Sequence, residues 1–445
     1  MWIPWKRVAE SPPSVRALLL SEVLTLFAGA IGQISVAWWI AQAHGASDLA
    51  RYGAFVASCT LITMPLISPL GDRLSKSRLI RWSSAILVLD AVVLGVLAHS
   101  GVYRLTMLCA CSALSILANA VLLPAQANIL PELVETKRLP DAIRLSRSAQ
   151  ALGGLLGPGL GGVALALTGL SGAIALGVLM SAGAAIAAWR LREPPHPSRQ
   201  SPSDGWFRDM AAGLHAKWGV PLDRWWTLTG ALMMVFLFPA TGMLLPLRIQ
   251  ALGLSPAWFG SCSAALSFGL LAGMAGAADF IIDRLDRVRS MLAAVLGCGL
   301  AVGLISRCNA ALELAALFFV IGLCMSITQL VGQTHRMLAM PEEFRSRMTS
   351  AHQAVGRLAA IVAPALAAEL LQHWPVTTVY LLLAIGFLAS GLLLLAIPEL
   401  MPFLRLDHEA VKGWYLRQYP DAFVSPQLDR AGARTRVRGP VRRRR

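Results

Sequence analysis

Twelve long apolar runs follow one another along this chain of 445 residues. A helix needs about 20 apolar residues to cross the hydrocarbon core of a bilayer, and each run reaches roughly that length. We therefore expect twelve membrane-spanning helices, at 17–41, 53–70, 79–99, 104–123, 145–168, 170–189, 225–247, 256–279, 290–306, 310–332, 348–371 and 376–398.

The amino-acid composition indicates that these apolar runs are surrounded by lipid. Hydrophobic residues make up 56% of the chain and charged residues 14%, against about 25% charged residues in a soluble protein. A soluble enzyme, a disordered protein and a secreted disulfide scaffold are therefore excluded. The net charge of +15 does not indicate a nucleic-acid partner, because the basic residues form short runs between apolar segments, where topology signals lie.

Basic residues also predict the topology. With a cytoplasmic N-terminus, the outer loops contain only four of the 39 Lys and Arg residues: Arg51, Arg104, Arg248 and Arg307. Apart from Arg357, which lies deep in a span, the others occupy the termini, the inner loops or inward-facing helix edges. Since cytoplasmic loops carry the excess of Lys and Arg, we expect an even number of spans, with both termini in the cytoplasm. The chain is then a multi-pass protein of the cell inner membrane.

The chain divides into two similar halves. Asp72 and Asp283 each begin the pattern Asp-Arg-Leu-x-[Lys/Arg]-x-Arg, and Gly157-Pro158 is matched by Ala363-Pro364. A parallel six-plus-six repeat with a basic central loop is typical of rocking secondary transporters. We expect four regions: a six-helix bundle over 1–190, a cytoplasmic central loop over 191–223, a second six-helix bundle over 224–400, and a basic cytoplasmic tail over 401–445. The second part of the central loop, 206–218, is expected to form an amphipathic helix. The tail after Phe403 is expected to be mobile and attracted to anionic lipid.

Several motifs resemble a known family. The segment Ser68–Lys76 (SPLGDRLSK) resembles the loop signature G-x-L-a-D-R-x-G-[RK] of the major facilitator superfamily, with serine at two usual glycine positions. Gly153–Gly162 (GGLLGPGLGG) matches the helix-5 signature G-x-x-x-G-P-x-x-G-G, which in that superfamily marks exporters that exchange substrate for protons. Leu123–Val134 and Pro341–Arg347 resemble the macrolide-efflux and enterobactin-exporter branch. The resemblance implies an all-α polytopic membrane protein with twelve transmembrane helices in the 6+6 pseudo-symmetric major facilitator fold.

The helix-5 signature also has a physical interpretation. Gly153, Gly157 and Gly161 recur every four residues and share one helix face, where another backbone can approach closely. Pro158 removes one backbone hydrogen bond and is expected to kink the helix, and Gly162 completes the signature. The alternative is a plain packing face without a role in transport.

Two acidic residues follow inner helix ends. Asp72 and Arg73 follow the second expected span, and Asp283 and Arg284 follow the eighth. A carboxylate at such a place can face the positive N-terminal end of another helix. The family resemblance implies that Asp72 faces the helix that starts near Met348, and Asp283 would do the same for the fifth span. These contacts would hold an inner gate closed; alternatively, the basic residues around them only set the topology.

Two carboxyl groups lie inside expected spans. Glu22 is about one and a half turns into the first span, and Asp90 is in the middle of the third. Each embedded charge costs ~2.5–3.5 kcal/mol on insertion scales, so it points to function. Burial disfavours the charged form of a carboxyl, so such a group can load and release a proton as access alternates. We expect Glu22 first and Asp90 second to couple protons; alternatively, Glu22 reaches the inner interface and Asp90 pairs with a polar neighbour.

A few further side chains inside the spans are candidates for the wall of a substrate cavity: Gln33, Asn119, Phe236, Gln329 and Gln333. Gln33 lies three turns above Glu22 on the same helix face. Methionine and aromatic surfaces with few hydrogen-bonding groups suit bulky amphipathic organic molecules. The alternative for each residue is ordinary helix packing or contact with lipid.

Motifs for other chemistry are absent from the sequence. The chain has no Walker loop, no metal-ligand set and no nucleophile triad, so we expect no enzyme, no primary pump, no metal and no cofactor. We interpret it as a monomeric transporter that exports an organic small molecule, such as a drug, siderophore or natural product, in exchange for protons. The alternatives are a lysophospholipid or lipid flippase of the same fold, and a non-transporting membrane sensor or scaffold. Deletion of residues 404–445 is expected to abolish function only for the scaffold.

Overall fold

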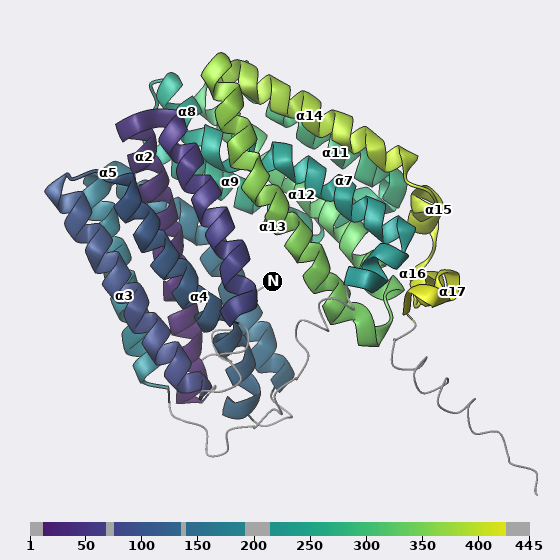
Figure 1. Cartoon of the computed structure of the whole chain (residues 1–445), viewed down its shortest axis with the longest axis horizontal. Helices are drawn as coiled ribbons and strands as arrows, with labels where there is room; N and C mark the ends of the chain where they lie inside the picture. Colours follow the sequence, from purple (N-terminus) through teal and green to yellow (C-terminus); the bar gives the residue numbers. More distant parts are fainter. Residues whose placement is uncertain (1–11, 68–74, 135–138, 192–213, 424–445) are drawn as a thin grey trace, which may run out of the picture.

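The computed structural model describes residues 12–67, 75–134, 139–191 and 214–423, and every regular element in these ranges is a helix. The helices form two bundles, one from each half of the chain, which stand side by side (Figure 1). The expected all-α architecture is therefore confirmed. Of the amphipathic helix expected over 206–218, residues 214–218 are described and are helical.

Two of the N-terminal helices contain a break. Gly45 interrupts α2 with φ 69° and ψ −144°, and Gly169 interrupts α5 with φ 68° and ψ −173°. Glycine adopts a positive φ without a steric penalty, so it is the residue type that tolerates such a break. The bounds of the N-terminal helices are α2 Pro13–Ile67, α3 Lys76–Ser100, α4 Leu105–Leu133 and α5 Leu139–Trp189.

The C-terminal bundle contains two π-helical turns. One begins at Pro239, which has no N–H to donate, and the other contains Gly276 at φ 124°. Each turn joins two α-helices along the chain. The bounds are α7 Pro221–Phe238, η2 Pro239–Met243, α8 Leu244–Ala251, α9 Ala257–Ala272, η3 Gly273–Ala277, α10 Ala278–Leu285, α11 Arg287–Ile305, α12 Ala311–Ala339, α13 Glu342–His373 and α14 Val376–Ala396.

Ten helical segments of the described chain are long and apolar enough to cross a membrane. The expected span 53–70 corresponds to the second half of α2, which is not among the ten. The expected spans 145–168 and 170–189 fall largely into one segment, Leu156–Trp189, which is broken at Gly169. The protein is thus polytopic, and the count of twelve spans stays a prediction.

Exposed apolar stripes mark the surfaces that face lipid. On α11, Leu296, Leu300 and Leu304 recur every fourth residue and are 53%, 59% and 55% exposed. On the opposite side of the same helix, Val295 and Val302 are buried, where α11 packs against α12 and α14. A helix that is apolar all round and half buried fits a bundle surrounded by hydrocarbon.

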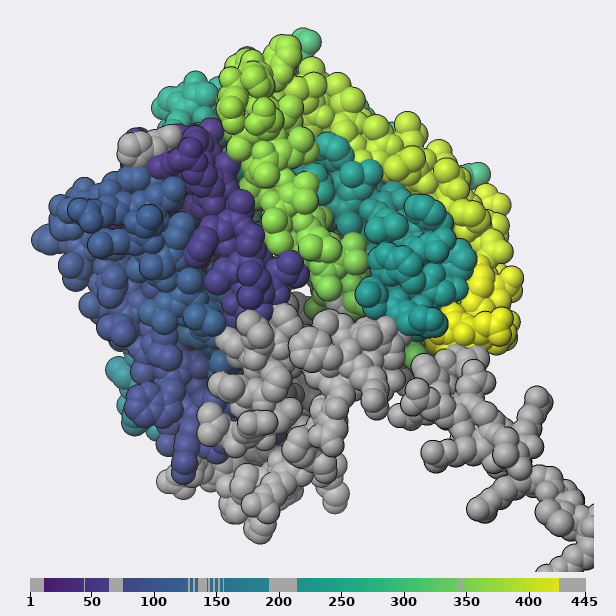
Figure 2. All heavy atoms as spheres, in the orientation of Figure 1, coloured from purple at the N-terminus to yellow at the C-terminus, as the bar shows by residue number. Residues whose placement is uncertain are grey.

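The two bundles meet mainly along two helix pairs, α2 with α13 and α5 with α9, and α2 also lies against η2 and α8. In the space-filling view, the second half of α2 (purple) touches α13 (green) along the middle of the face (Figure 2). There a Cβ atom on Gly53 would lie 3.2 Å from the ring of Pro364. At the other pair, a Cβ atom on Gly162 would overlap the Cα of Gly260. Pro158 and Pro364, which the sequence places at equivalent positions of the repeat, therefore lie in the two helices that carry these contacts.

The chain after Phe403 differs from our expectation of a mobile tail. Residues 404–423 pack against the C-terminal bundle, because their apolar side chains cover its end: Phe403 is 1% exposed and Tyr415 is fully buried. The Gly413 backbone N–H donates to the Leu338 carbonyl over 2.9 Å. This C-terminal segment comprises α15 Leu400–Arg405, α16 His408–Val411, α17 Trp414–Gln418 and the 3-10 turn η4 Pro420–Phe423.

Candidate substrate cavity and charged sites

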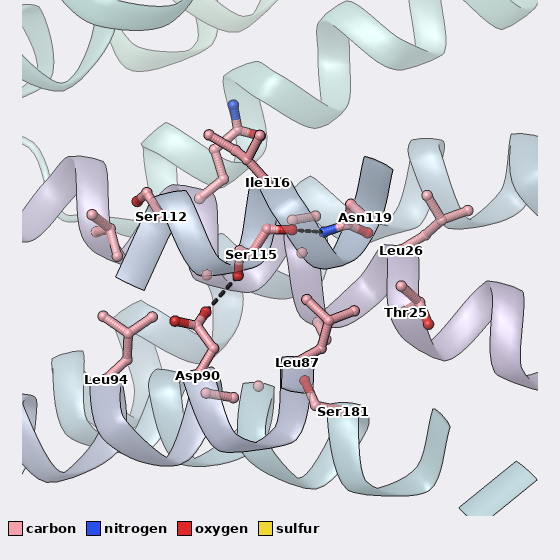
Figure 3. A pocket seen from close by; sticks show the side chains of 18 of the residues that line it. Thr25, Leu26, Leu87, Asp90, Leu94, Ser112, Ser115, Ile116, Asn119 and Ser181 are labelled. Carbon is pink, nitrogen blue, oxygen red and sulfur yellow. Dashed lines mark hydrogen bonds between the residues drawn. The ribbon is translucent and has the colours of Figure 1, made fainter. Parts of the chain in front are cut away.

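A cavity of about 590 Å³ lies inside the N-terminal bundle, between α2, α3, α4 and α5. Its wall contains the polar side chains Gln33, Asp90 and Asn119, which the sequence singled out. Figure 3 shows Asp90 and Asn119 in this wall. Ser112, Ser115 and Asn119 are spaced three and four residues apart on α4, so they share one helix face. That spacing directs a polar stripe of α4 into a largely apolar cavity.

The two oxygens of the Asp90 carboxylate differ in their hydrogen bonding. It is 4% exposed, and its Oδ2 accepts a hydrogen bond of 2.5 Å from the Ser115 hydroxyl (Figure 3). The Cys111 thiol, a weak donor, lies beside the same carboxylate. Among the described residues, the other oxygen, Oδ1, has no hydrogen-bond partner. The carboxylate therefore keeps one free oxygen at the cavity wall.

The other polar groups of the cavity make neutral hydrogen bonds. The Asn119 amide donates to the Ser115 carbonyl over 2.9 Å, and the Tyr52 and Ser112 hydroxyls share a hydrogen bond of 2.6 Å. Gln33 is exposed and lines the cavity. These groups can orient a ligand but supply no positive charge.

Glu22 lies outside the lining of this cavity. It is 2% exposed, and its Oε2 accepts a hydrogen bond of 2.8 Å from the Ser146 hydroxyl of α5. The Gln150 amide in turn donates to Ser146 over 3.3 Å. Glu22 is thus buried at the contact between α2 and α5, whereas its neighbour Thr25 reaches the cavity.

The helix-5 signature packs against two different helices. Cβ atoms on Gly153 and Gly157 would press on Leu26 and Ala30 of α2 at 2.7 and 2.8 Å, and one on Gly161 would lie 3.1 Å from the backbone of Ile31. Gly162 faces Gly260 of α9. Pro158 lines the cavity. The signature therefore joins α5 to the first half of α2 and to the opposite bundle.

The residues expected at the inner gate are described only in the C-terminal half. Asp72 and Arg73 lie outside the described residues. Asp283 and Arg284 are exposed at the end of α10, where the Arg284 guanidinium lies 4.5 Å from the centre of the Phe280 ring. Asp283 forms no ion pair with any residue that the structure describes. The next acidic residue, Asp286, instead caps α11, accepting from the Val288 N–H over 2.8 Å.

The candidates in the C-terminal bundle do not line the large cavity. The ring of Phe236 packs directly against Gly386 of α14. Gln329 and Gln333 are exposed on α12 and line neither of the two cavities described here. A smaller cavity of about 120 Å³ in this bundle is lined by methionine and aromatic side chains, including Met233, Met234 and Met325, but not by Phe236.

Sequence reasoning missed a buried ionic cluster at the end of the C-terminal bundle. Asp223 is fully buried; its Oδ2 lies 2.5 Å from the Lys217 Nζ, and its Oδ1 lies 2.6 Å from the Arg336 Nε. The Tyr415 hydroxyl donates to the same Oδ1 over 3.3 Å. Burial lowers the pKa of Lys217 to about 8 and raises the pKa of Tyr415 well above its usual value. We call these four residues the Asp223 cluster.

The Asp223 cluster had no signal in the sequence. Lys217 and Arg336 stand in basic inner segments, where topology alone accounts for a positive charge. Tyr415 is 192 residues away from Asp223 in the chain. The same cluster reaches α13, since Arg336 lies 3.1 Å from the His352 Nδ1.

Comparisons with known proteins agree with this architecture. The sequence profile described as Major Facilitator Superfamily matches residues 18–310 and 277–414. The search of curated proteins gave no match.

Three of the similar solved structures are transporters. A bacterial homolog of the human lysosomal transporter Spinster, inward-facing and unoccupied, is 15% identical with a TM-score of 0.63, covering 96% of this chain and 100% of its own. The peptide transporter POT in complex with sulfate is 15% identical with a TM-score of 0.67, covering 91% and 100%. The nucleoside transporter NupG is 11% identical with a TM-score of 0.66, covering 86% and 99%. The chain belongs to the Major Facilitator Superfamily and is a multi-pass membrane transporter rather than an enzyme.

Proposed function

We propose that this protein exports an organic small molecule by alternating access and exchanges it for protons. The observation that carries the proposal is Asp90, a buried carboxylate with one free oxygen at the wall of a cavity of about 590 Å³. A cavity of that size falls in the range of small-molecule sites, about 300–1,000 Å³. Drugs, siderophores and other natural products are the substrate classes we favour, following the resemblance to the macrolide-efflux and enterobactin-exporter branch.

The two embedded carboxyls receive different roles in this proposal. Asp90 meets substrate and proton in the cavity, together with Gln33 and Asn119. Glu22 is separated from the cavity lining but lies on α2 against α5, the helix that also contacts the opposite bundle. Protonation of Glu22 would change the contact between these helices, so we assign it to coupling rather than to binding.

The movement in this proposal takes place at the two pairs of contacting helices, α2 with α13 and α5 with α9. Glycine contacts at both pairs permit close backbone approach without interlocking side chains. The inner gate is assigned to Asp72, Arg73, Asp283 and Arg284. Twelve spans, a monomeric state, cytoplasmic termini and an inner-membrane location complete the proposal.

Everted vesicles that contain the full chain test this function. An imposed pH gradient, acidic inside, should drive uptake of at least one of three probes: ethidium, chloramphenicol or a catecholate siderophore. Asp90→Asn and Glu22→Gln should each abolish the gradient-driven component, because neither variant can exchange a proton at that site. Asp279→Asn is the matched control, since Asp279 is exposed at the start of α10.

The results separate the proposal from its alternatives. Uptake that is independent of the gradient and survives both substitutions would favour the flippase. No transport of any probe in vesicles with correctly inserted protein would contradict the proposed function.

A further inference from the structure

We infer that the cavity of the N-terminal bundle binds an organic cation, whose positive group sits at the Oδ1 oxygen of Asp90. The inference rests on the proposed function and goes further by naming the charge of the substrate. It depends on three observations: the state of the carboxylate, the absence of a competing cation at the cavity wall, and the apolar remainder of the lining.

The carboxylate is built to accept one more partner. Asp90 is 4% exposed, Ser115 occupies its Oδ2, and Oδ1 has no hydrogen-bond partner among the described residues. A buried acceptor left unsatisfied costs free energy, more so when it is charged. A ligand that places a positive charge beside Oδ1 would reduce that cost.

No cation among the described residues of the cavity wall neutralises Asp90. The described lining residues include no Lys, Arg or His, and Asp90 is the one acidic residue among them. Attraction between opposite charges is much stronger in an apolar interior than in water. The cavity therefore selects for one positive charge and against anions.

Ser115 is a positioning residue in this arrangement. Its hydroxyl donates to Oδ2 over 2.5 Å and so fixes the orientation of the carboxylate (Figure 3). The Asn119 amide is engaged with the Ser115 carbonyl, which leaves its carbonyl oxygen for a ligand donor.

The rest of the wall fits an apolar body. Leu26, Leu87, Leu94, Ile116 and Leu123 line the same space as Asp90 (Figure 3). Apolar surfaces with few polar groups are typical of sites for drug-sized ligands. The substrate class is therefore a hydrophobic monocation, such as a quaternary ammonium, a phosphonium or a protonated amine on an apolar scaffold.

Equilibrium binding of radiolabelled tetraphenylphosphonium to the purified full chain at pH 8 tests the inference. We expect saturable binding that weakens at least tenfold in Asp90→Asn and is restored within a few fold in Asp90→Glu, which keeps the charge. Asp279→Asn should bind as tightly as the wild type.

Two outcomes would overturn the inference: tetraphenylphosphonium bound equally well by Asp90→Asn, or not bound by the wild type. Chloramphenicol and the siderophore are the comparison probes. If either is pumped by the pH gradient while neither ethidium nor tetraphenylphosphonium is recognised, the substrate class is wrong and the proposed function stands. If no probe is pumped, the proposed function itself fails.

Discussion

Each of the two bundles buries an aspartate, and the two aspartates differ in whether basic residues contact the carboxylate. Asp90 in the N-terminal bundle is 4% exposed and faces a cavity, and none of the described residues of the cavity wall is basic. Asp223 in the C-terminal bundle is fully buried, and Lys217 and Arg336 contact its two oxygens.

This difference indicates a division of labour. A buried carboxylate that is paired with fixed cations cannot exchange them for a ligand without a large loss of stability. A carboxylate whose partners are a serine hydroxyl and a weakly donating thiol can accept a ligand or a proton. In the proposed function the N-terminal bundle binds the substrate, whereas the buried charges of the C-terminal bundle are paired with one another. The cavity volumes, about 590 Å³ against about 120 Å³, point the same way.

The largest effect should follow removal of the C-terminal segment. Deletion of residues 404–445 removes Leu404, Val411, Tyr415 and Phe423, all buried against the C-terminal bundle. Each buried side chain of this size contributes about 1.5–3 kcal/mol, so the deletion should exceed any single substitution. The change in melting temperature of the purified protein in detergent measures this loss of stability.

A deletion of residues 424–445 is the matched control, because it leaves those four side chains in place. An unchanged melting temperature after the longer deletion would show that the segment does not stabilise the bundle. A loss of transport in the longer deletion is expected from instability alone, so it no longer separates a transporter from a scaffold.

Asp223→Asn should have the next largest effect. It leaves Lys217 and Arg336 buried without a counter-charge, which costs about 3–5 kcal/mol when a buried pair loses one partner. Asp90→Asn should not lower the free energy of unfolding, since no buried cation depends on Asp90. If the two substitutions change the unfolding midpoint in detergent equally, the proposed difference between the paired Asp223 and the unpaired Asp90 is wrong.

Above about pH 8, the Asp223 cluster should make the stability of the protein depend on pH. The pKa of Lys217 is lowered to about 8 in the folded protein, below the usual 10.5, so the unfolded chain binds more protons between these pH values. Stability should then rise with pH above about 8, by at most about 1.4 kcal/mol per pH unit from this group.

The measurement is the unfolding midpoint of the wild type and Lys217→Met between pH 7.5 and 9.5. We expect the difference in slope between the two proteins to show the contribution of Lys217. Parallel pH profiles would mean that Lys217 does not titrate in this range. Above pH 10, Tyr415 acts in the opposite direction, because its pKa is raised by burial and the unfolded chain loses that proton first.

Ser115→Ala should have the smallest effect. It removes the hydrogen bond to the Asp90 Oδ2 and leaves the charge in place, so tetraphenylphosphonium affinity should change by a few fold rather than tenfold. Thermal stability should fall by about 1 kcal/mol, the net contribution of a typical hydrogen bond. If Ser115→Ala weakens binding as much as Asp90→Asn, orientation rather than charge governs recognition.

Several features of the fold were predictable because their causes are local. The apolar runs predict the membrane helices, since the bilayer thickness sets their length. The spacing of Gly153, Gly157 and Gly161 predicts a helix face for close packing, and the structure places all three against α2. The breaks at Gly45 and Gly169 fall between expected spans. The packing of the C-terminal segment was not predicted. Its basic residues suggested a solvated tail, whereas its apolar side chains are buried only by contact with the C-terminal bundle.

The sequence by itself determined that this protein resides in a membrane, that it has two related halves and which carboxyls lie among apolar residues. Each of these follows from the order of side chains along a short stretch of chain. Only the tertiary structure decided which carboxyls are neutralised. Asp223 contacts Tyr415, which is 192 residues away in the chain, and two basic residues, Lys217 and Arg336. Asp90 accepts a hydrogen bond from Ser115 and lines a cavity. The physical reason is that charge pairing depends on distances of a few ångströms across helix contacts, and composition, periodicity and motif spacing do not specify those distances.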